Sequence, residues 1–257
     1  MSTINPSAYS AYSSYLRDTQ SKINLIKTQL NTGNKIISAA DQSTITNLSS
    51  NASAYTAVTQ SIGGAQSVIT SAQKGLTSIG DLLRQMQALA NQATNPSLSN
   101  LDAINLNNRF QKLVTDIGKI ATTASVNGSN LLSGTAGVNV KTGIDNTPAS
   151  RTHIQPVNIY GMITMGALGG IKLESIADAN SALSSIASAI ATVNNGQISL
   201  KTSAKQLSAK ANAINGITTS SQSQLASLQN LDKPALQSQL QMLNNNLAVY
   251  TLLSKLG

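Results

Sequence analysis

Side chains that could carry out chemistry are few and widely spaced in this chain of 257 residues. It has no Cys, its one histidine is His153, and its nine acids stand singly apart from Glu174 and Asp178. A metal ion needs several ligands, and a Ser–His pair would have to use His153 without a Gly-x-Ser-x-Gly elbow. No Gly-x-x-x-x-Gly-Lys-Ser/Thr phosphate loop occurs either. We therefore predict an exposed strand position for His153, no catalytic, metal or cofactor site, and a protein that is not an enzyme.

The composition favours a structural protein over a compact enzyme. Aromatic residues make up 3% of the chain and charged residues 10%, compared with roughly 25% charged residues in typical soluble domains. The net charge of +8 arises from scarce acids and from 17 scattered Lys and Arg, whereas a nucleic-acid groove would cluster its cations among aromatic residues. Residues 1–20 carry no secretion signal pattern, and no 18-residue apolar run occurs. We expect neither nucleic-acid binding nor membrane insertion.

The strongest pattern is a stripe of apolar residues spaced alternately by four and three, which continues for five heptads without a slip. A stripe this narrow must meet the stripes of partner helices. The unbroken register favours a coiled-coil rod, with an ordinary amphipathic helix in a bundle as the alternative. The stripe consists of Val58, Ile62, Ala65, Ile69, Ala72, Leu76, Ile79, Leu83, Met86, Ala90 and Ala93.

A similar apolar stripe occupies residues 9–30 near the start of the chain. Gly33 suits the end of that helix, because glycine readily adopts the left-handed conformation found there. Ser38 or Asp41 suits the N-cap of the next helix, which we expect over about residues 44–95.

The break at 95–97 contains a proline and separates this helix from another one. Ser99 or Asn100 can cap the new helix, and we expect it to end at 127–128. A proline turn between two striped helices predicts an antiparallel hairpin. The stripe of the second helix comprises Leu106, Phe110, Leu113, Ile117, Ile120 and Ala124.

The period changes from helical to alternating in residues 129–175. Residues 138–142 and 152–159 alternate between apolar and polar, and turn-forming residues fill 143–150. This pattern predicts a β-hairpin, with Pro156 placing its strand at an edge.

The last third of the chain is patterned as two helices. Asp232 can cap the final one, and Pro234 suits its first turn. The longer helix carries Leu183, Ile186, Ile190, Val193, Leu200, Ala204, Leu207, Ala211 and Ile214 in heptads. The final helix carries Leu236, Leu240, Leu243, Leu247 and Tyr250.

These patterns predict a mainly α fold of long heptad-patterned helices, arranged as a rod-like antiparallel bundle or coiled coil with a small β-hairpin region in the middle of the chain. The terminal helices have no partner nearby in sequence, so each needs the other terminus or another copy of the chain. We expect five segments, namely 1–42, 43–128, 129–175, 176–230 and 231–257.

Three motifs resemble those of bacterial flagellins. Residues 30–41, Leu-Asn-Thr-Gly-Asn-Lys-Ile-Ile-Ser-Ala-Ala-Asp, resemble the family's Leu-Ser-Thr/Ser-Gly-x-Arg/Lys-Ile-Asn-Ser-Ala-x-Asp signature. Residues 89–95 resemble its Leu-x-x-Gln-Ala/Ser-x-Asn run before the helix break. Residues 127–132 match its Phe-Asn-Gly-x-x-Leu-Leu element, with Val126 in place of Phe. The order of helices and hairpin agrees with the family along nearly the whole chain.

The resemblance implies a homopolymeric, secreted filament of the bacterial flagellum, exported unfolded through the flagellar type III apparatus. Its implied partners are an export chaperone and the cap and hook-junction proteins. Residues 1–42 and 231–257 would then form an inner, channel-lining domain and the helices between them a rod, without the family's variable outer domains. The inner-domain seam would be Tyr12, Leu16, Ile23, Ile26, Leu30, Leu236, Leu240, Leu243, Leu247 and Tyr250. The rod seam would be Val58, Ile62, Ile69, Leu76, Ile79, Leu83, Met86, Phe110, Leu113, Ile117, Ile186, Ile190, Val193, Leu200 and Leu207.

Two other functions remain open at this stage. Hook–filament junction proteins share these helices and part of the carboxy-terminal pattern, but are present in few copies. A coiled-coil adhesin or toxin component is a third reading.

A receptor-sensing patch of the family, an Arg on the long helix and a Glu on the next, is replaced by about Gln87 and Arg109. The resemblance therefore implies weak recognition by the flagellin-sensing Toll-like receptor.

Overall fold

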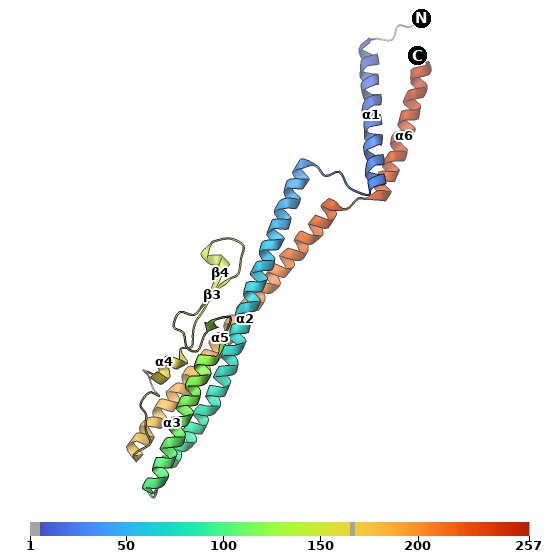
Figure 1. Cartoon of the computed structure of the whole chain (residues 1–257). Helices are drawn as coiled ribbons and strands as arrows, with labels where there is room; N and C mark the ends of the chain where they lie inside the picture. Colours follow the sequence, from blue (N-terminus) through green and yellow to red (C-terminus); the bar gives the residue numbers. More distant parts are fainter. Residues whose placement is uncertain (1–5, 165–167, 257) are drawn as a thin grey trace. The chain divides into compact units, whose positions relative to one another are not determined.

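The computed structural model describes the backbone of residues 6–164 and 168–256, and the side chains of residues 13–164 and 168–251. It is mainly α, as the sequence predicts (Figure 1). The helices are α1 (Pro6–Thr32), α2 (Ala39–Ala93), α3 (Asn100–Thr123), α4 (Ile159–Thr164), α5 (Ile176–Gln229) and α6 (Lys233–Leu256). The strands are β1 (Ser125–Val126), β2 (Ser129–Asn130), β3 (Val138–Lys141) and β4 (Arg151–Ile154), with a 3₁₀ turn at Pro148–Ser150.

The chain divides into two compact units. One is Asn51–Thr218, which holds most of α2 and α5 together with α3, α4 and the strands. The other consists of the described parts of Met1–Ser50 and Thr219–Gly257, which include α1 and α6.

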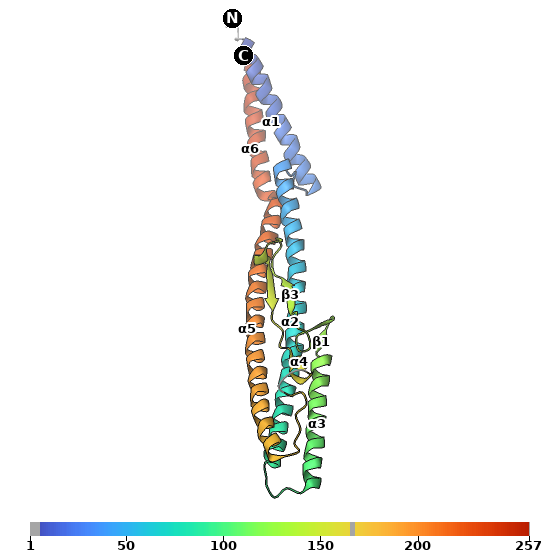
Figure 2. The same ribbon diagram turned by 90° about the vertical axis from the view of Figure 1, so that its left-hand side faces the viewer.

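In the unit Asn51–Thr218, α2 and α5 run side by side in opposite directions, with α3 alongside them (Figure 2). Two contacts fix their register: the Gln197 amide lies 3.4 Å from the Thr77 hydroxyl, and Val193 borders Gly80. One continuous core of buried aliphatic side chains lines the three helices, and Phe110 on α3 is fully buried in it. The predicted antiparallel bundle is therefore confirmed for this unit.

Helices α3 and α5 begin with the same capping arrangement. Ser99 Oγ accepts a hydrogen bond from the Asp102 backbone N–H at 3.2 Å and donates to Asp102 Oδ2 at 2.6 Å. Ser175 and Asp178 repeat the arrangement at 3.1 and 2.7 Å. The serine satisfies an N–H that has no partner within the helix, and the acid complements the helix dipole. Of the two caps that the sequence allows for α3, Ser99 is the one used.

Helix α3 ends at Thr123, so the expectation that it continues to Asn127–Gly128 is wrong. Asn127 and Gly128 have φ angles of 50° and 76° and form the two-residue turn of the β1–β2 hairpin. A tight hairpin turn with positive φ at both central residues strongly prefers Asn-Gly, because these residues adopt that conformation at least cost. The dipeptide that we interpreted as a helix end is therefore a hairpin signal.

Asn130 connects the end of α3 to the core. Its side-chain Nδ2 donates to the carbonyls of Ala121 and Thr122 at 2.8 and 3.1 Å, and these belong to the unpaired last turn of the helix. Its Oδ1 accepts from the backbone N–H groups of Leu132 and Ser133 at 2.7 and 3.1 Å. These hydrogen bonds turn the chain so that Leu132 enters the core.

The predicted hairpin in the middle of the chain is confirmed, but its second strand is shorter than expected. β3 and β4 pair antiparallel, with Val138 opposite Ile154. We expected the second strand to continue to Ile159, whereas β4 ends at Ile154 and Ile159 begins α4. Pro156 lies outside the strand, so its placement in an edge strand is wrong. The chain leaves the sheet there because the Val157 N–H donates to the Leu131 carbonyl, at 2.7 Å.

Two helix glycines leave space in the core for residues of these loops. A Cβ atom at Gly75 on α2 would lie 2.7 Å from Leu132 Cδ1, and one at Gly196 on α5 would overlap the side chain of Val157. Residues 194–197, Asn-Asn-Gly-Gln, interrupt the apolar heptads, yet α5 continues through them. Gly196 is required because Val157 occupies the space of its missing side chain. Gly63 and Gly64 have no atom within 4 Å of such a Cβ, so packing does not explain that pair.

We expect Gly196→Ala to destabilise the unit Asn51–Thr218. Overpacking against a stiff, β-branched valine costs about 1–3 kcal/mol, which exceeds the roughly 0.5–1 kcal/mol that alanine gains within a helix. Gly216→Ala is the matched control on the same helix, because its Cβ would meet no atom within 4 Å. It should raise the midpoint of thermal unfolding while Gly196→Ala lowers it. Equal shifts in the two variants would show that Val157 does not occupy this notch.

In the other unit, α1 ends where the sequence predicts. Gly33 has a φ of 70° and its N–H donates to the Gln29 carbonyl at 2.9 Å, which is the usual left-handed helix ending. Ser38 caps α2, since its Oγ accepts from the Asp41 N–H at 3.1 Å. Helix α2 therefore begins at Ala39, about one turn earlier than the expected residue 44.

Candidate assembly surfaces

The α1–α6 pair forms the first candidate surface. On α1, Ile23 and Ile26 are buried and Leu16 and Leu30 are half-buried, whereas the side chain of Tyr12 lies outside the described residues. On α6, the seam residues Leu236, Leu240, Leu243, Leu247 and Tyr250 are all half-buried. The rings of Tyr15 and Tyr250 meet edge to face with centroids 4.7 Å apart. The two halves of the inner-domain seam therefore contact each other within one chain.

Helix α6 presents a second apolar stripe that α1 does not cover. Met242 and Val249 are more than half exposed and lie one heptad apart on the same side of the helix. The seam leucines of α6 are also less buried than Ile23 and Ile26 on α1. The pair thus leaves apolar surface uncovered on α6, as expected of an element that packs against another chain.

Helix α1 also carries buried polar side chains and an exposed ion pair. Gln29 is buried, and its Oε1 accepts from the Ile36 backbone N–H at 3.2 Å, which ties the linker to the helix. The Lys22 ammonium lies 2.7 Å from the Asp18 carboxylate, and this hydrogen bond and charge raise the pKa of Lys22 above its usual value. Both side chains are more than half exposed, so solvent screens the pair. The α1–α6 contact therefore depends on its apolar seam.

The rod-seam residues lie within the unit Asn51–Thr218. All of them are buried except Leu113 and Ile190, which are half-buried against the same core. The stripe on α2 meets stripes from both α3 and α5, so it serves as the core of a three-helix arrangement within one chain. The surfaces left for other molecules are the outer faces of these helices.

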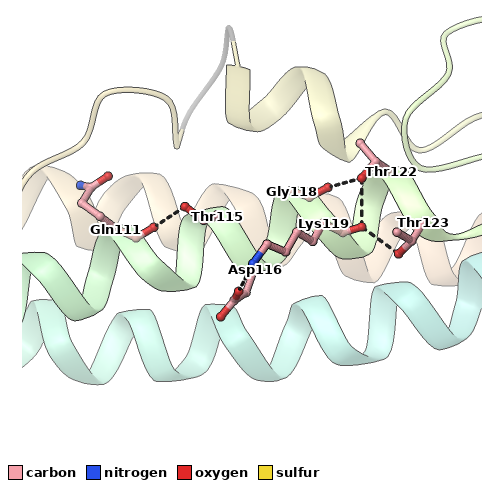
Figure 3. Close-up of polar contacts among 7 residues, drawn as sticks. All are labelled: Gln111, Thr115, Asp116, Gly118, Lys119, Thr122 and Thr123. Atoms are coloured by element: carbon pink, nitrogen blue, oxygen red, sulfur yellow. Dashed lines mark hydrogen bonds and ion pairs between the residues drawn. The ribbon is translucent and has the colours of Figure 1, made fainter.

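Polar side chains on the exposed face of α3 bond to groups of the same helix. Thr115 and Thr122 donate to carbonyls one turn earlier, and Lys119 forms an ion pair with Asp116 at 3.5 Å (Figure 3). Similar bonds recur along α2 and α5, which explains how helices rich in Ser and Thr keep their hydroxyls bonded.

Gln87 and Arg109, the expected receptor-patch positions, are not brought together. Arg109 lines a hollow of about 450 Å³ between α2 and α3, together with Gln85 and Leu89 of α2. Gln87 lies two residues beyond Gln85, about 200° around the helix, and so points away from that hollow. Sequence reasoning missed Gln85 as the glutamine that shares the hollow with Arg109. Weak recognition by the Toll-like receptor stays a prediction.

His153 lies exposed on β4, where its Nδ1 is 2.8 Å from Asn139 Oδ1 on the paired strand. In the part of the chain that the structure describes, no three His, Asp or Glu side chains gather where they could hold a metal ion. Within the same residues, no helix is both long and apolar enough to cross a membrane.

Long paired helices, with apolar surface left uncovered on α6, define a helical protein whose candidate sites are packing surfaces. The family described as the bacterial flagellin N-terminal helical region matches residues 4–137, which is more than half of the chain. The chain therefore belongs to the bacterial flagellin family.

Individual relatives agree with this assignment over different lengths. Flagellin FljK of Caulobacter vibrioides is 34% identical over 123 residues, which cover 46% of this chain and 45% of FljK. The match thus spans less than half of that relative. The flagellin of Listeria innocua is 24% identical over 244 residues, covering 88% of this chain and 85% of its own. A putative flagellar hook-associated protein from Vibrio parahaemolyticus, at 15% identity and a TM-score of 0.61, covers 74% of this chain and 98% of its own and shares the fold.

Proposed function

We propose that this chain is a structural subunit that polymerises into the extracellular filament of a bacterial flagellum. The observation that carries the proposal is the flagellin match over residues 4–137, to which the alignment with the Listeria innocua flagellin adds the carboxy-terminal half. The function is structural, with packing surfaces in place of an active site. Export through the flagellar type III apparatus, an export chaperone, and contacts with cap and hook-junction proteins belong to the same proposal.

The uncovered stripe on α6 supports assembly through the terminal helices. Met242 and Val249 are exposed beside a seam that α1 buries only in part. In a polymer, copies of α1 and α6 from neighbouring subunits would cover this surface, and each new contact would bury apolar area. The unit Asn51–Thr218 has its own core and would supply the rod surfaces of the subunit.

Electron microscopy of purified protein, induced to polymerise by seeds or precipitant, tests the proposal. We expect long, smooth, narrow tubes with a central channel. Folded protein that yields only monomers or short caps would contradict the filament function and favour the hook–filament junction function instead.

We expect the terminal helices to be ordered by assembly. An isolated pair of helices of about 25 residues with half-exposed seams is marginal in water, so polymerisation would offset much of its ordering cost. Limited proteolysis of dilute monomer should therefore remove residues 1–30 and the end of α6 well before it cuts Asn51–Thr218. The same protease should leave the polymer's termini intact. Equal protection of residues 1–30 in monomer and polymer would contradict this expectation.

A further inference from the structure

The groove between α2 and α5 in the unit Asn51–Thr218 has one sign of charge. Residues 42–80 and 179–231 contain no Asp or Glu, so the charged groups along this part of the helix pair are Lys74, Lys201, Lys205 and Lys210. None of these four ammonium groups forms an ion pair with a described residue. The groove therefore carries uncompensated positive charge.

The same groove is hollowed and has an apolar contact point. Two adjoining hollows of about 510 and 620 Å³ share Gln73 and Lys201 in their walls. Ile198, at 64% exposure, lines the first hollow together with Lys201, Gln197 and Gln73. A partner that fits this surface would present carboxylates around an apolar side chain.

Such a surface exists at the far end of the same unit, where α3 and α5 begin. Asp102, Glu174 and Asp178 lie there, with Lys172 bound to Glu174 at 3.1 Å as the cation. Leu101 and Ile104 on α3 are 68% and 57% exposed. Gln111 Nε2 donates to the Ile171 carbonyl, and the Leu173 N–H donates to Asn107 Oδ1. These bonds hold the segment before α5 against α3, so these groups share one end of the unit.

The acidic end and the basic groove cannot meet within one copy. Ile198 follows Ile176, at the start of α5, by 22 residues on one continuous helix, which is about 33 Å at 1.5 Å per residue. Complementary surfaces at separate places on one rigid body make a heterologous contact, and a heterologous contact that does not close into a ring gives an open polymer.

We propose that the acidic, apolar end of one subunit, comprising Leu101, Asp102, Ile104 and Glu174, docks on the Ile198–Lys201–Lys205 groove of a second copy. The occupant of the groove is thus the chain itself, and the contact repeats head to tail along the polymer. This inference rests on the proposed function and names the rod surfaces through which it operates.

Two charge-reversed variants test the contact. The groove variant carries Lys201→Glu and Lys205→Glu. The end variant carries Glu174→Lys and Asn105→Lys, the latter at an exposed position next to Ile104, and it leaves both capping aspartates in place. Lys141→Glu with Arg151→Glu, on the paired strands β3 and β4, changes the net charge by the same amount as the groove variant and is the matched control. Circular dichroism and thermal unfolding confirm that each variant folds.

We expect each charge-reversed variant alone to form at least about tenfold less seeded polymer than wild type, because like charges then face each other. The control should polymerise like wild type. An equimolar mixture of the groove and end variants should recover polymer, since the acidic groove of one accepts the basic end of the other. Sedimentation and electron microscopy measure all five samples, wild type included.

Two results would overturn the contact while leaving the filament function intact. One is normal polymerisation of the groove variant alone, and the other is a mixture that stays as poor as its components. Wild-type protein that never polymerises would remove the filament function and this contact together, which distinguishes the two failures.

Discussion

Ile26→Asp is expected to abolish polymers while the unit Asn51–Thr218 remains folded. Ile26 is 3% exposed, in the face of α1 that packs on α6, where the described seam residues of both helices are apolar apart from the Tyr250 hydroxyl. A buried charge without a partner costs several kcal/mol, enough to separate a marginal helix pair. Pelleting of polymer after seeding should therefore fall to background. Thermal unfolding of the rod unit, followed by circular dichroism, should be unchanged.

Leu25→Asp is the matched control for this prediction. It adds the same carboxylate one residue away, where the native leucine is 48% exposed. If assembly uses the α1–α6 seam, Leu25→Asp should keep most of the polymer that Ile26→Asp loses. Leu243→Asp, on the facing side of α6, should behave like Ile26→Asp. Polymer formation by Ile26→Asp at wild-type yield would show that the seam is dispensable for assembly.

The helices could be predicted from the sequence because their signals are local. The 4-3 spacing from Val58 to Ala93 fixes both the helical period and the buried face, and the buried face of α2 follows it. Capping signals at Gly33 and Ser99 work through hydrogen bonds within four residues, so they too can be read along the chain.

The loops could not be predicted equally well, because distant partners decide them. Asn127–Gly128 suits a helix end and a hairpin turn, and the choice depends on Asn130, which bonds to the last carbonyls of α3 and to the residues after β2. The alternating pattern predicts a second strand that continues past Pro156. Instead, Val157 hydrogen-bonds to Leu131 and packs in the space beside Gly196. Neither contact produces a periodic pattern in the sequence.

The candidate surfaces could be predicted where they depend on local spacing, but not where they depend on distant partners. The inner-domain seam follows from spacing, whereas the uncovered side of α6 emerges only when α1 is in place. The charge of the α2–α5 groove requires knowing that two acid-free segments lie side by side, although paired residues such as Thr77 and Gln197 are 120 positions apart in sequence. Their composition is plain in the sequence, but the pairing register that aligns Thr77 with Gln197 is not.

Phe110→Ala should cost the unit Asn51–Thr218 about 3–5 kcal/mol, because it removes a fully buried aromatic ring and leaves a cavity. Phe110 lies between Leu106 and Ile117 on the buried face of α3, so its loss loosens α3 from α2 and α5. The midpoint of thermal unfolding should fall by roughly 10 °C for a unit of this size. Arg109→Ala, its exposed neighbour, should shift that midpoint by a degree or two at most.

Phe110→Ala should also reduce polymerisation if the acidic end docks as proposed. Phe110 and Leu106 hold α3 on the core, while Gln111 donates to the Ile171 carbonyl and Asn107 accepts from the Leu173 N–H. Leu101 and Ile104 lie at the start of this anchored helix. Phe110→Ala should then polymerise poorly even at temperatures where the unit is still folded, since its docking end is no longer held. Wild-type polymer yield from folded Phe110→Ala would mean that the start of α3 takes no part in subunit contacts.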